Sequence, residues 1–226
     1  MAKFWAKFPE LRGTVFIVTY GRSGSTLLQS VVQSIRGAHF TGENYLALLP
    51  LMNTVRRVQG ARNDWGKTKL EPNRPWFGAS QMKPNLYRDA CIAAFVNHVL
   101  QPPQEARWIG FKEIRYSEVG NQFNDLMEFM RAGFPNARFI FNSRDAKSVS
   151  ESRWWRQHSF EKVCEMIADM DQRFSAYQRA HPDIAVHLKY ETYADDPMGF
   201  KPIFDLLSEP FDQEAVERIL KVKLSH

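Results

Sequence analysis

The stretch that decides the fold is Thr14–Arg36, which reads TVFIVTYGRSGSTLLQSVVQSIR. It opens with an apolar, β-branched run at 15–18, which is typical of a buried strand, and then breaks into a small-residue turn at 20–24. Apolar residues recur at helical spacing from Ser25 onward, which predicts a helix with one apolar face. A strand, a glycine turn and a helix N-terminus direct several backbone N–H groups at one anion. The stretch therefore predicts a site for a phosphate or a sulfate.

Side chains of the turn add to this anion site. Arg22 supplies a fixed positive charge, and Ser23, Ser25 and Thr26 supply hydroxyl donors. The turn is not a Walker A loop, because that motif needs Gly, four residues and then Gly-Lys-Ser/Thr, whereas here Ser25 stands at the lysine position. An ordinary tight turn between a strand and a helix remains the alternative on this stretch alone.

The composition is that of a globular protein with a modest basic excess. The 226 residues are 44% hydrophobic and 13% aromatic, and the net charge is +5 with a pI near 9.2. This charge suits an anionic ligand but is not the dense basic stripe of a duplex-DNA binder, so we expect no nucleic-acid partner.

Two isolated cysteines, Cys91 and Cys164, fit a reducing compartment. No apolar run is long enough to span a bilayer or to act as a signal peptide, so we expect a cytoplasmic protein without stable membrane insertion.

Strand and helix signals alternate along the chain. Strands are predicted at 15–18, 38–41, 108–111, 137–141 and 184–188, and helices at 25–36, 45–58, 86–100, 123–130, 146–156, 160–179, 191–194, 198–207 and 213–222. The alternation predicts a single α/β, P-loop-like domain over residues 1–226, with a mostly parallel central sheet flanked by helices on both faces. Ligands of such sheets bind beyond the carboxyl ends of the strands. The candidate groups expected there are Gly21–Thr26, Glu43, Lys112 and Arg144.

Between the second and third predicted helices the periodic pattern dissolves. The segment 59–85 holds several glycines and prolines, together with Trp65, Trp76 and Phe77 among lysines and arginines. Long irregular segments inside a compact domain are often functional. The segment is therefore interpreted as an acceptor-binding loop, with a solvated basic loop carrying a few packed aromatic residues as the alternative.

A second anion site is predicted at the end of the fourth strand. Arg144 stands at the strand end, and Ser148, Ser152 and Arg156 follow at intervals of four, which would place them on one face of the next helix. An arginine fork binds two phosphate oxygens at once, so this face suits a doubly charged phosphate. A polar, solvent-exposed helix face is the alternative. Two anion sites on neighbouring loops imply a ligand with two separated anionic groups.

These motifs resemble those of sulfotransferases that use 3′-phosphoadenosine 5′-phosphosulfate (PAPS). The turn Tyr20–Leu28, YGRSGSTLL, resembles the family's 5′-phosphosulfate loop, in the form closest to the tyrosylprotein and carbohydrate branches. Arg144, with Ser152 eight residues later, resembles the 3′-phosphate motif, and Arg156 matches an additional arginine of the tyrosylprotein branch. The pair Gly42-Glu43 follows the loop at the distance where that branch carries its catalytic base.

The resemblance implies a role for each matching residue. Lys112 is similar to the central-strand lysine, and Tyr190, in the segment LKYE, is similar to the tyrosine that approaches the nucleotide. The nucleotide would be held by Arg22, Ser23, Gly24, Ser25, Thr26, Leu27, Arg144, Ser152, Arg156 and Tyr190, and catalysis would involve Glu43, Arg22 and Lys112. The implied reaction moves the sulfuryl group of PAPS to an acceptor hydroxyl, with Glu43 as general base, without a metal ion, and with adenosine 3′,5′-bisphosphate as product.

The acceptor and two other classes of protein stay open. A carbohydrate or another small hydroxylated metabolite is the expected acceptor, and the chain is interpreted as a soluble, bacterial-type member of the family. A P-loop kinase or NTPase is an alternative, against which stands the absence of the Walker lysine and of a strand-end aspartate for Mg²⁺. A non-catalytic anion-binding or nucleic-acid-binding protein would explain the basic segment 59–85, but not the spacing from Arg144 to Arg156.

Overall fold

A five-stranded sheet forms the centre of the molecule. The computed structural model describes residues 2–152 and 154–222. The strands are β1 (Gly13–Val18), β2 (Ala38–Thr41), β3 (Trp108–Glu113), β4 (Arg138–Ser143) and β5 (Ala185–Lys189). They lie in the order β2-β3-β1-β4-β5, and each neighbouring pair is parallel. All six residues of β1 and of β3 are buried, as expected for strands covered on both faces.

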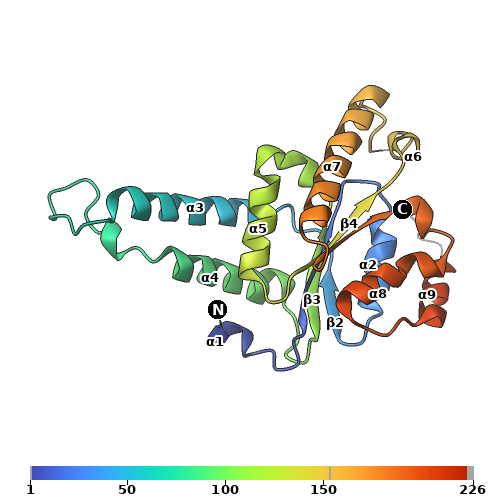
Figure 1. Cartoon of the computed structure of the whole chain (residues 1–226), viewed down its shortest axis with the longest axis horizontal. Helices are drawn as coiled ribbons and strands as arrows, with labels where there is room; N and C mark the ends of the chain where they lie inside the picture. Colours follow the sequence, from blue (N-terminus) through green and yellow to red (C-terminus); the bar gives the residue numbers. More distant parts are fainter. Residues whose placement is uncertain (1, 153, 223–226) are drawn as a thin grey trace.

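Helices cover both faces of the sheet (Figure 1). The described helices are α1 (Ala2–Trp5), α2 (Ser25–Gln33), α3 (Leu48–Trp65), α4 (Pro84–Phe95), α5 (Phe123–Gly133), α6 (Ala146–Ser150), α7 (Phe160–Ala180), α8 (Lys201–Leu207) and α9 (Gln213–Leu220). One hydrophobic core lies between the sheet and α4, α5 and α7, and a second lies between the sheet and α2, α8 and α9. Alternate residues of β1 serve the two cores: Phe16 packs in the first and Ile17 in the second. The predicted α/β class, with a parallel sheet between two helical layers, is confirmed.

The strand order brings the important loops to one edge. β1 is central, with β3 on one side and β4 on the other, and their registers pair Phe16 with both Phe111 and Phe139. Because all these strands run in the same direction, the loops that follow them meet at the carboxyl edge of the sheet. The order of the strands across the sheet reverses at β1, and such folds bind ligands at this switch point.

Helices α3 and α4 form a hairpin that projects from the body of the molecule, and we call it the arm (Figure 1). The predicted helix 45–58 is wrong at both ends, since α3 spans Leu48–Trp65. The loop expected to begin at residue 59 is therefore helical over its first seven positions. Packing against α4 compensates for the poor helix formers Gly60 and Asn63 in this turn of α3. A side-chain hydrogen bond from Arg62 to the Gly66 carbonyl then closes the C-terminus of α3.

Other boundaries differ in smaller ways. The helix expected over 86–100 is α4 followed by a π-helical turn at Val96–Leu100, and the one expected over 191–194 is a 3₁₀ turn at Tyr190–Thr192. Other short 3₁₀ turns lie at Ala79–Gln81, Tyr116–Glu118, Gly120–Gln122 and Pro197–Phe200. Cys91 and Cys164 are partly buried free thiols. Among the helices of the described residues, none combines the length and the apolar character that crossing a bilayer requires.

Candidate active site

A cavity of about 540 Å³ opens at the carboxyl edge of the sheet. It is lined by Arg22, Gly24, Ser25, Thr26, Leu27, Glu43, Lys112, Ile114, Arg144, Trp154 and Tyr190. These residues come from the loop after β1 and the first turn of α2, from the segments after β2, β4, β5 and α6, and from the end of β3 with the residue that follows it. Nine of the twelve residues that the sequence predicted for the site therefore line one cavity, namely Arg22, Gly24, Ser25, Thr26, Leu27, Glu43, Lys112, Arg144 and Tyr190. Ser23, Ser152 and Arg156 are the predicted residues absent from the lining.

The loop after β1 is a backbone cradle. Arg22 and Gly24 both adopt left-handed conformations, with φ of 69° and 80°, and no side chain caps the N-terminus of α2. The N–H groups of the first turn of α2 are thus left for a ligand. Gly24 is required for two reasons. Its positive φ is a conformation that other residues rarely adopt, and a Cβ at this position would lie 2.1 Å from the ring of Tyr190. The absence of a side chain lets the Tyr190 ring pack directly on the cradle.

A buried network fixes this loop to the neighbouring strand. The Thr19 hydroxyl lies 2.7 Å from both the Ser23 hydroxyl and the Asn142 carbonyl oxygen. The Asn142 amide donates a hydrogen bond of 2.8 Å to the Ser23 carbonyl oxygen, and Asn142 in turn accepts one from the Tyr193 hydroxyl. Ser23 is fully buried, so its hydroxyl serves to hold the loop and does not line the cavity.

Arg144 stands where the sequence predicted the second anion site. Its guanidinium lies over the Tyr190 ring at 4.3 Å and donates a hydrogen bond of 3.2 Å from Nη1 to the Arg22 carbonyl oxygen. Its Nε is buried and has no hydrogen-bond partner among the described residues. A buried, unpaired guanidinium donor is costly unless a ligand satisfies it. Arg144 is therefore held in place by the Tyr190 ring and the Arg22 carbonyl oxygen, with one guanidinium donor still unused.

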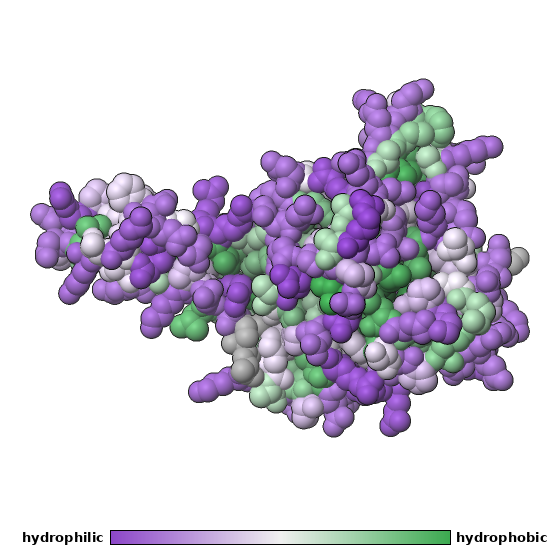
Figure 2. All heavy atoms as spheres, viewed as in Figure 1, coloured by the Kyte–Doolittle hydropathy of each residue, from purple (hydrophilic) through white to green (hydrophobic). Residues whose placement is uncertain are grey.

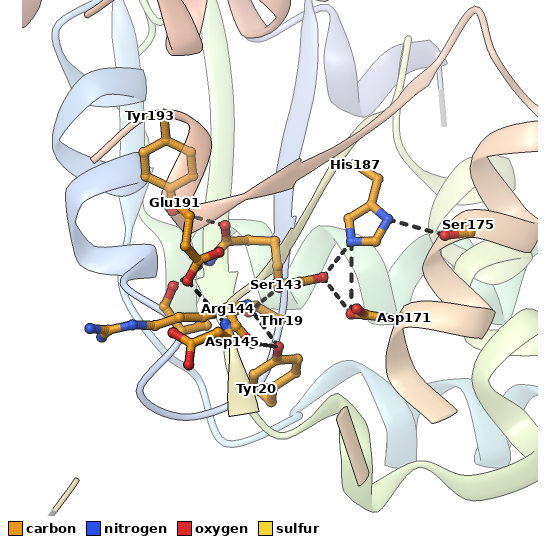
Figure 3. Close-up of polar contacts among 12 residues, drawn as sticks. Thr19, Tyr20, Ser143, Arg144, Asp145, Asp171, Ser175, His187, Glu191 and Tyr193 are labelled. Carbon is orange, nitrogen blue, oxygen red and sulfur yellow. Dashed lines mark hydrogen bonds and ion pairs between the residues drawn. The ribbon is translucent and has the colours of Figure 1, made fainter. Parts of the chain in front are cut away.

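A polar cluster lies behind Arg144 and supports it (Figure 3). The Tyr20 hydroxyl accepts a hydrogen bond of 2.8 Å from the Arg144 backbone N–H, and burial raises the pKa of Tyr20, so this hydroxyl stays protonated. Ser143, adjacent in β4, hydrogen-bonds to both Asp171 and His187. Burial lowers the pKa of His187, and the nearby Asp171 carboxylate opposes this effect. The neutral imidazole joins β4, β5 and α7 directly behind the arginine.

Ser152 and Arg156 are not brought into the cavity. The helix predicted over 146–156 is wrong, because α6 ends at Ser150. The Ser152 hydroxyl donates to the Val149 carbonyl oxygen at 2.7 Å, and Arg156 Nε donates to the Glu151 carbonyl oxygen at 3.3 Å. Such local hydrogen bonds compete with a continued helix. The Trp155 indole, which donates to the Gly21 carbonyl oxygen at 3.0 Å, also draws this segment onto the loop after β1.

Glu43 and Lys112 face each other on the opposite side of the cavity. Lys112 Nζ lies 2.8 Å from Glu43 Oε1, and Arg115 Nη1 lies 3.7 Å from Glu43 Oε2. The Glu43 side chain retains 37% of its exposure, whereas that of Lys112 retains 9%. Glu43 does not cap α3, since no side chain caps that helix and Asn44 Oδ1 accepts the Ala47 N–H. The carboxylate is thus accessible from the cavity and oriented by two cations.

Glu113 supports the cavity wall through contacts that the sequence did not reveal. Its buried carboxylate accepts hydrogen bonds from the N–H groups of Asn44 and Leu46, at 3.1 and 2.9 Å. It accepts two more from the N–H groups of Ile114 and Arg115, at 2.8 and 3.1 Å. Glu113 therefore ties the loop that carries Glu43 to the end of β3. The only sequence signal was a carboxylate at the end of an apolar strand, and this pattern does not identify the groups that the carboxylate binds.

Aromatic side chains complete the rim beside Glu43. The Arg115 guanidinium lies 4.4 Å from the Tyr45 ring and 5.8 Å from the Trp154 ring. Tyr45 is 79% exposed, and Trp154 lines the cavity together with Ile114. Tyr45 and Leu46 both have positive φ angles, which turn the chain sharply between Glu43 and the start of α3. These rim residues were not predicted as part of the site.

The comparisons with known proteins agree with this geometry. The profile of the sulfotransferase family matches residues 14–213, so the chain belongs to that family. The resemblance read from the loop after β1 and from Arg144 is thereby confirmed. Among solved structures, the sulfotransferase domain from the curacin biosynthetic pathway is similar over 91% of this chain and 77% of its own, with 21% identity and a TM-score of 0.55. This likeness supports the fold alone.

A second solved structure is similar at a lower level. It is a thymidylate kinase from Candida albicans, 12% identical, over 79% of this chain and 83% of its own, with a TM-score of 0.41. No curated protein matches the chain. Across the described residues, no group of three or more His, Cys, Asp or Glu side chains is arranged to hold a metal ion.

Proposed function

We propose that this sulfotransferase uses PAPS as its sulfuryl donor and transfers the group to an acceptor hydroxyl. The observation that carries the proposal is a cavity that presents two cationic groups from different loops. One group is Arg22 with the uncapped N-terminus of α2, and the other is Arg144 with its unpartnered Nε. A ligand with separated 5′ and 3′ anionic groups suits this arrangement. The residues present therefore fit the donor.

Each of the two cationic groups would hold one part of the donor. The N–H groups of residues 23–26, with the hydroxyls of Ser25 and Thr26, would bind the 5′-phosphosulfate. Arg144 would bind the 3′-phosphate through a charge-assisted fork, and Tyr190 would pack beside the nucleotide. Ser152 and Arg156 are proposed to join this site only if their segment moves, because their side chains bond to backbone carbonyls in this structure.

Glu43 would act as the general base. When bound, PAPS supplies a sulfuryl group already activated as a mixed anhydride with phosphate. Glu43 would accept the proton of the acceptor hydroxyl as its oxygen bonds to sulfur, and Lys112 and Arg22 would stabilise the charge that grows on the departing phosphate oxygen. The Lys112–Glu43 contact of 2.8 Å supports this division, because one lysine can orient the base and face the reacting atoms.

The acceptor is proposed to be a carbohydrate or another small hydroxylated metabolite. Ile114 and Trp154 line the cavity, and Tyr45 stands exposed beside Glu43. Aromatic faces of this kind pack well against the apolar face of a sugar ring. Among the described residues, none from the expected acceptor-binding loop at 59–85 lines the cavity, so that role stays a prediction.

The decisive experiment is a thermal-shift comparison of two nucleotides. We expect adenosine 3′,5′-bisphosphate to raise the Tm without added metal, because it binds only the native state. ADP lacks the 3′-phosphate and should raise the Tm much less. Equal shifts from both nucleotides, or a shift that requires Mg²⁺, would contradict the proposal and favour a kinase-like site. Screening of hydroxylated acceptors with ³⁵S-labelled PAPS would then identify the acceptor.

A further inference from the structure

The tip of the arm, residues 62–83, exposes aromatic side chains. Trp65 and Trp76 stack on each other with ring centroids 5.5 Å apart and an interplanar angle of 2°. They remain 49% and 42% exposed, and the neighbouring Phe77 is 49% exposed. Three large aromatic residues half in solvent at one end of a helical hairpin form a concentration of apolar surface that the fold does not require.

Cations surround these rings. Lys67, Lys69, Arg74 and Lys83 are all exposed, and in the described part of the chain none of them forms an ion pair with a carboxylate. With Arg62, the tip carries five basic residues against two acidic ones, a net charge of +3 out of +5 for the whole protein. The tip is thus the site of most of the excess positive charge.

The tip is ordered and projecting. Hydrogen bonds from the Arg74 N–H to the Glu71 carbonyl, and from the Phe77 N–H to the Arg74 carbonyl, both 3.0 Å, shape its backbone. Figure 1 shows it at the far end of the arm, away from the sheet. Figure 2 shows that the visible face of the arm is covered mainly by hydrophilic residues. The exposed aromatic groups of the tip therefore sit on a protrusion.

We propose that the tip of the arm docks on the surface of an anionic lipid bilayer. Tryptophan is favoured at the boundary between headgroups and acyl chains, where its ring is partly buried and its indole N–H stays hydrated, and a phenylalanine beside it adds apolar surface that the acyl boundary buries. Lysines beside them are attracted to the negative surface potential of acidic lipids. A convex, aromatic and cationic tip inserts shallowly into a deformable surface. The docking leaves the cavity at the sheet edge free and does not depend on its reaction.

A single-stranded nucleic acid is the main competing partner. Such ligands bind to aromatic platforms within a basic groove that follows the phosphate backbone. In the tip, Trp65 and Trp76 already occupy one face of each other, so no base can enter between them. The charges also cluster at the end of a hairpin. These observations favour the lipid surface.

Cosedimentation of the full chain with lipid vesicles tests the proposal. We expect binding to vesicles of phosphatidylcholine with phosphatidylserine, weak binding to phosphatidylcholine alone, and loss of binding as salt rises. Changing both Lys67→Gln and Lys69→Gln should weaken binding about 25-fold, since each lysine near an anionic surface contributes about fivefold. Phe77→Ser should weaken it about tenfold, the lower end of what burial of one phenylalanine contributes.

Matched variants on the body of the protein serve as controls. Arg36→Gln with Lys162→Gln removes the same net charge from two other exposed positions, and Phe160→Ser removes a ring that is 52% exposed in α7. Neither change should weaken vesicle binding more than about twofold on this proposal, because electrostatic attraction falls off within a Debye length. Brominated lipids should also quench tryptophan fluorescence, and Trp65→Phe with Trp76→Phe should remove most of that quenching.

Three results would overturn the proposal. The first is no binding to phosphatidylserine vesicles at low salt. The second is an equal loss of binding in the tip variants and the body variants, which would mean non-specific attraction. The third is tighter binding to a single-stranded oligonucleotide than to the vesicles, with the same dependence on the tip, which would assign the surface to nucleic acid. None of these readouts involves sulfuryl transfer, so failure here is distinct from failure of the proposed function.

Discussion

The donor side and the base side of the cavity are held by different kinds of contact. The donor side consists of the loop after β1 together with Arg144, and its cradle is one continuous stretch of chain fixed by neutral hydrogen bonds through Thr19 and Asn142. The base side consists of Glu43, Lys112 and Arg115. There the pair Lys112–Glu43 joins residues 69 positions apart, and both loops depend on one buried carboxylate, that of Glu113.

This difference in contacts predicts that the two sides respond differently to substitution of single side chains. A continuous loop whose backbone supplies the donors is insensitive to most single side-chain changes, with Gly24 as an exception. A base assembled from distant segments has the opposite character, because its geometry rests on a few charged side chains. Variants of Glu43 and Glu113 should therefore reduce turnover without affecting nucleotide affinity, and variants of Arg144 should do the reverse.

The largest effect is expected on the base side. Glu43→Gln keeps the size of the side chain and much of its hydrogen bonding but removes the proton acceptor. We expect turnover to fall about 10²–10⁴-fold, the usual contribution of one general base. The affinity for adenosine 3′,5′-bisphosphate and the Tm should stay near wild type, as measured by calorimetry and thermal shift. Near-normal turnover with a good acceptor would show that the proton goes elsewhere.

The next effect is expected on the donor side. Arg144→Ala should weaken binding of adenosine 3′,5′-bisphosphate roughly 10–150-fold, the range for one charge-assisted hydrogen bond. Binding of adenosine 5′-phosphosulfate, which lacks the 3′-phosphate, should barely change. Ser152→Ala is the matched comparison and should cost less than about tenfold, because its hydroxyl must first leave the Val149 carbonyl. Equal losses for both ligands in Arg144→Ala would give Arg144 a structural role.

Glu113→Gln tests whether one buried carboxylate positions the base. The Gln amide would face N–H donors in place of one oxygen, which should destabilise the protein by about 1–3 kcal/mol. Turnover should fall about tenfold, less than the 10²-fold of a 1 Å misplacement. Nucleotide affinity should not change. A loss of stability without a change in kcat at a temperature well below the Tm would make Glu113 purely structural.

The smallest effect concerns pH on the donor side. Burial lowers the pKa of His187 below its ordinary value of 6.5, so the native state binds this proton less well than the unfolded chain. The stability that His187 contributes is complete above pH 6.5 and is lost as the pH falls toward the native pKa. The groups around it are Ser143, Asp171, Ser175 and Lys189.

The measurement is the free energy of unfolding between pH 7 and pH 5. One proton changes it by at most about 1.4 kcal/mol per pH unit. His187→Asn should show a smaller decrease over this range than the wild type, even if it starts from a lower stability. Identical pH profiles for the two proteins would mean that His187 is not the group that titrates.

Much of the donor side could be predicted because its signals are local. The apolar run at 15–18, the glycine turn and the periodic helix gave the cradle in order, and the strand ending at Ser143 gave the position of Arg144. The same use of local patterns failed for the segment after β4, where the helix was predicted to continue to residue 156 but α6 ends at Ser150. Ser152 and Arg156 share a helix face only if α6 continues, and their own side chains bond to the backbone instead.

By itself, the sequence determined that a strand, a turn and a helix follow one another within 14–36 and that strands and helices alternate, and it predicted the residue types of two candidate anion sites. Hydrophobic periodicity and turn preferences depend on residues that are close together in the chain, so they can be recognised in a single sequence. Only the tertiary structure decided that Lys112 meets Glu43, that Glu113 holds both loops, and that α3 extends to Trp65 to carry an arm. Those features depend on packing and hydrogen bonds between segments distant in the chain, whose free energies exceed the local preferences they override.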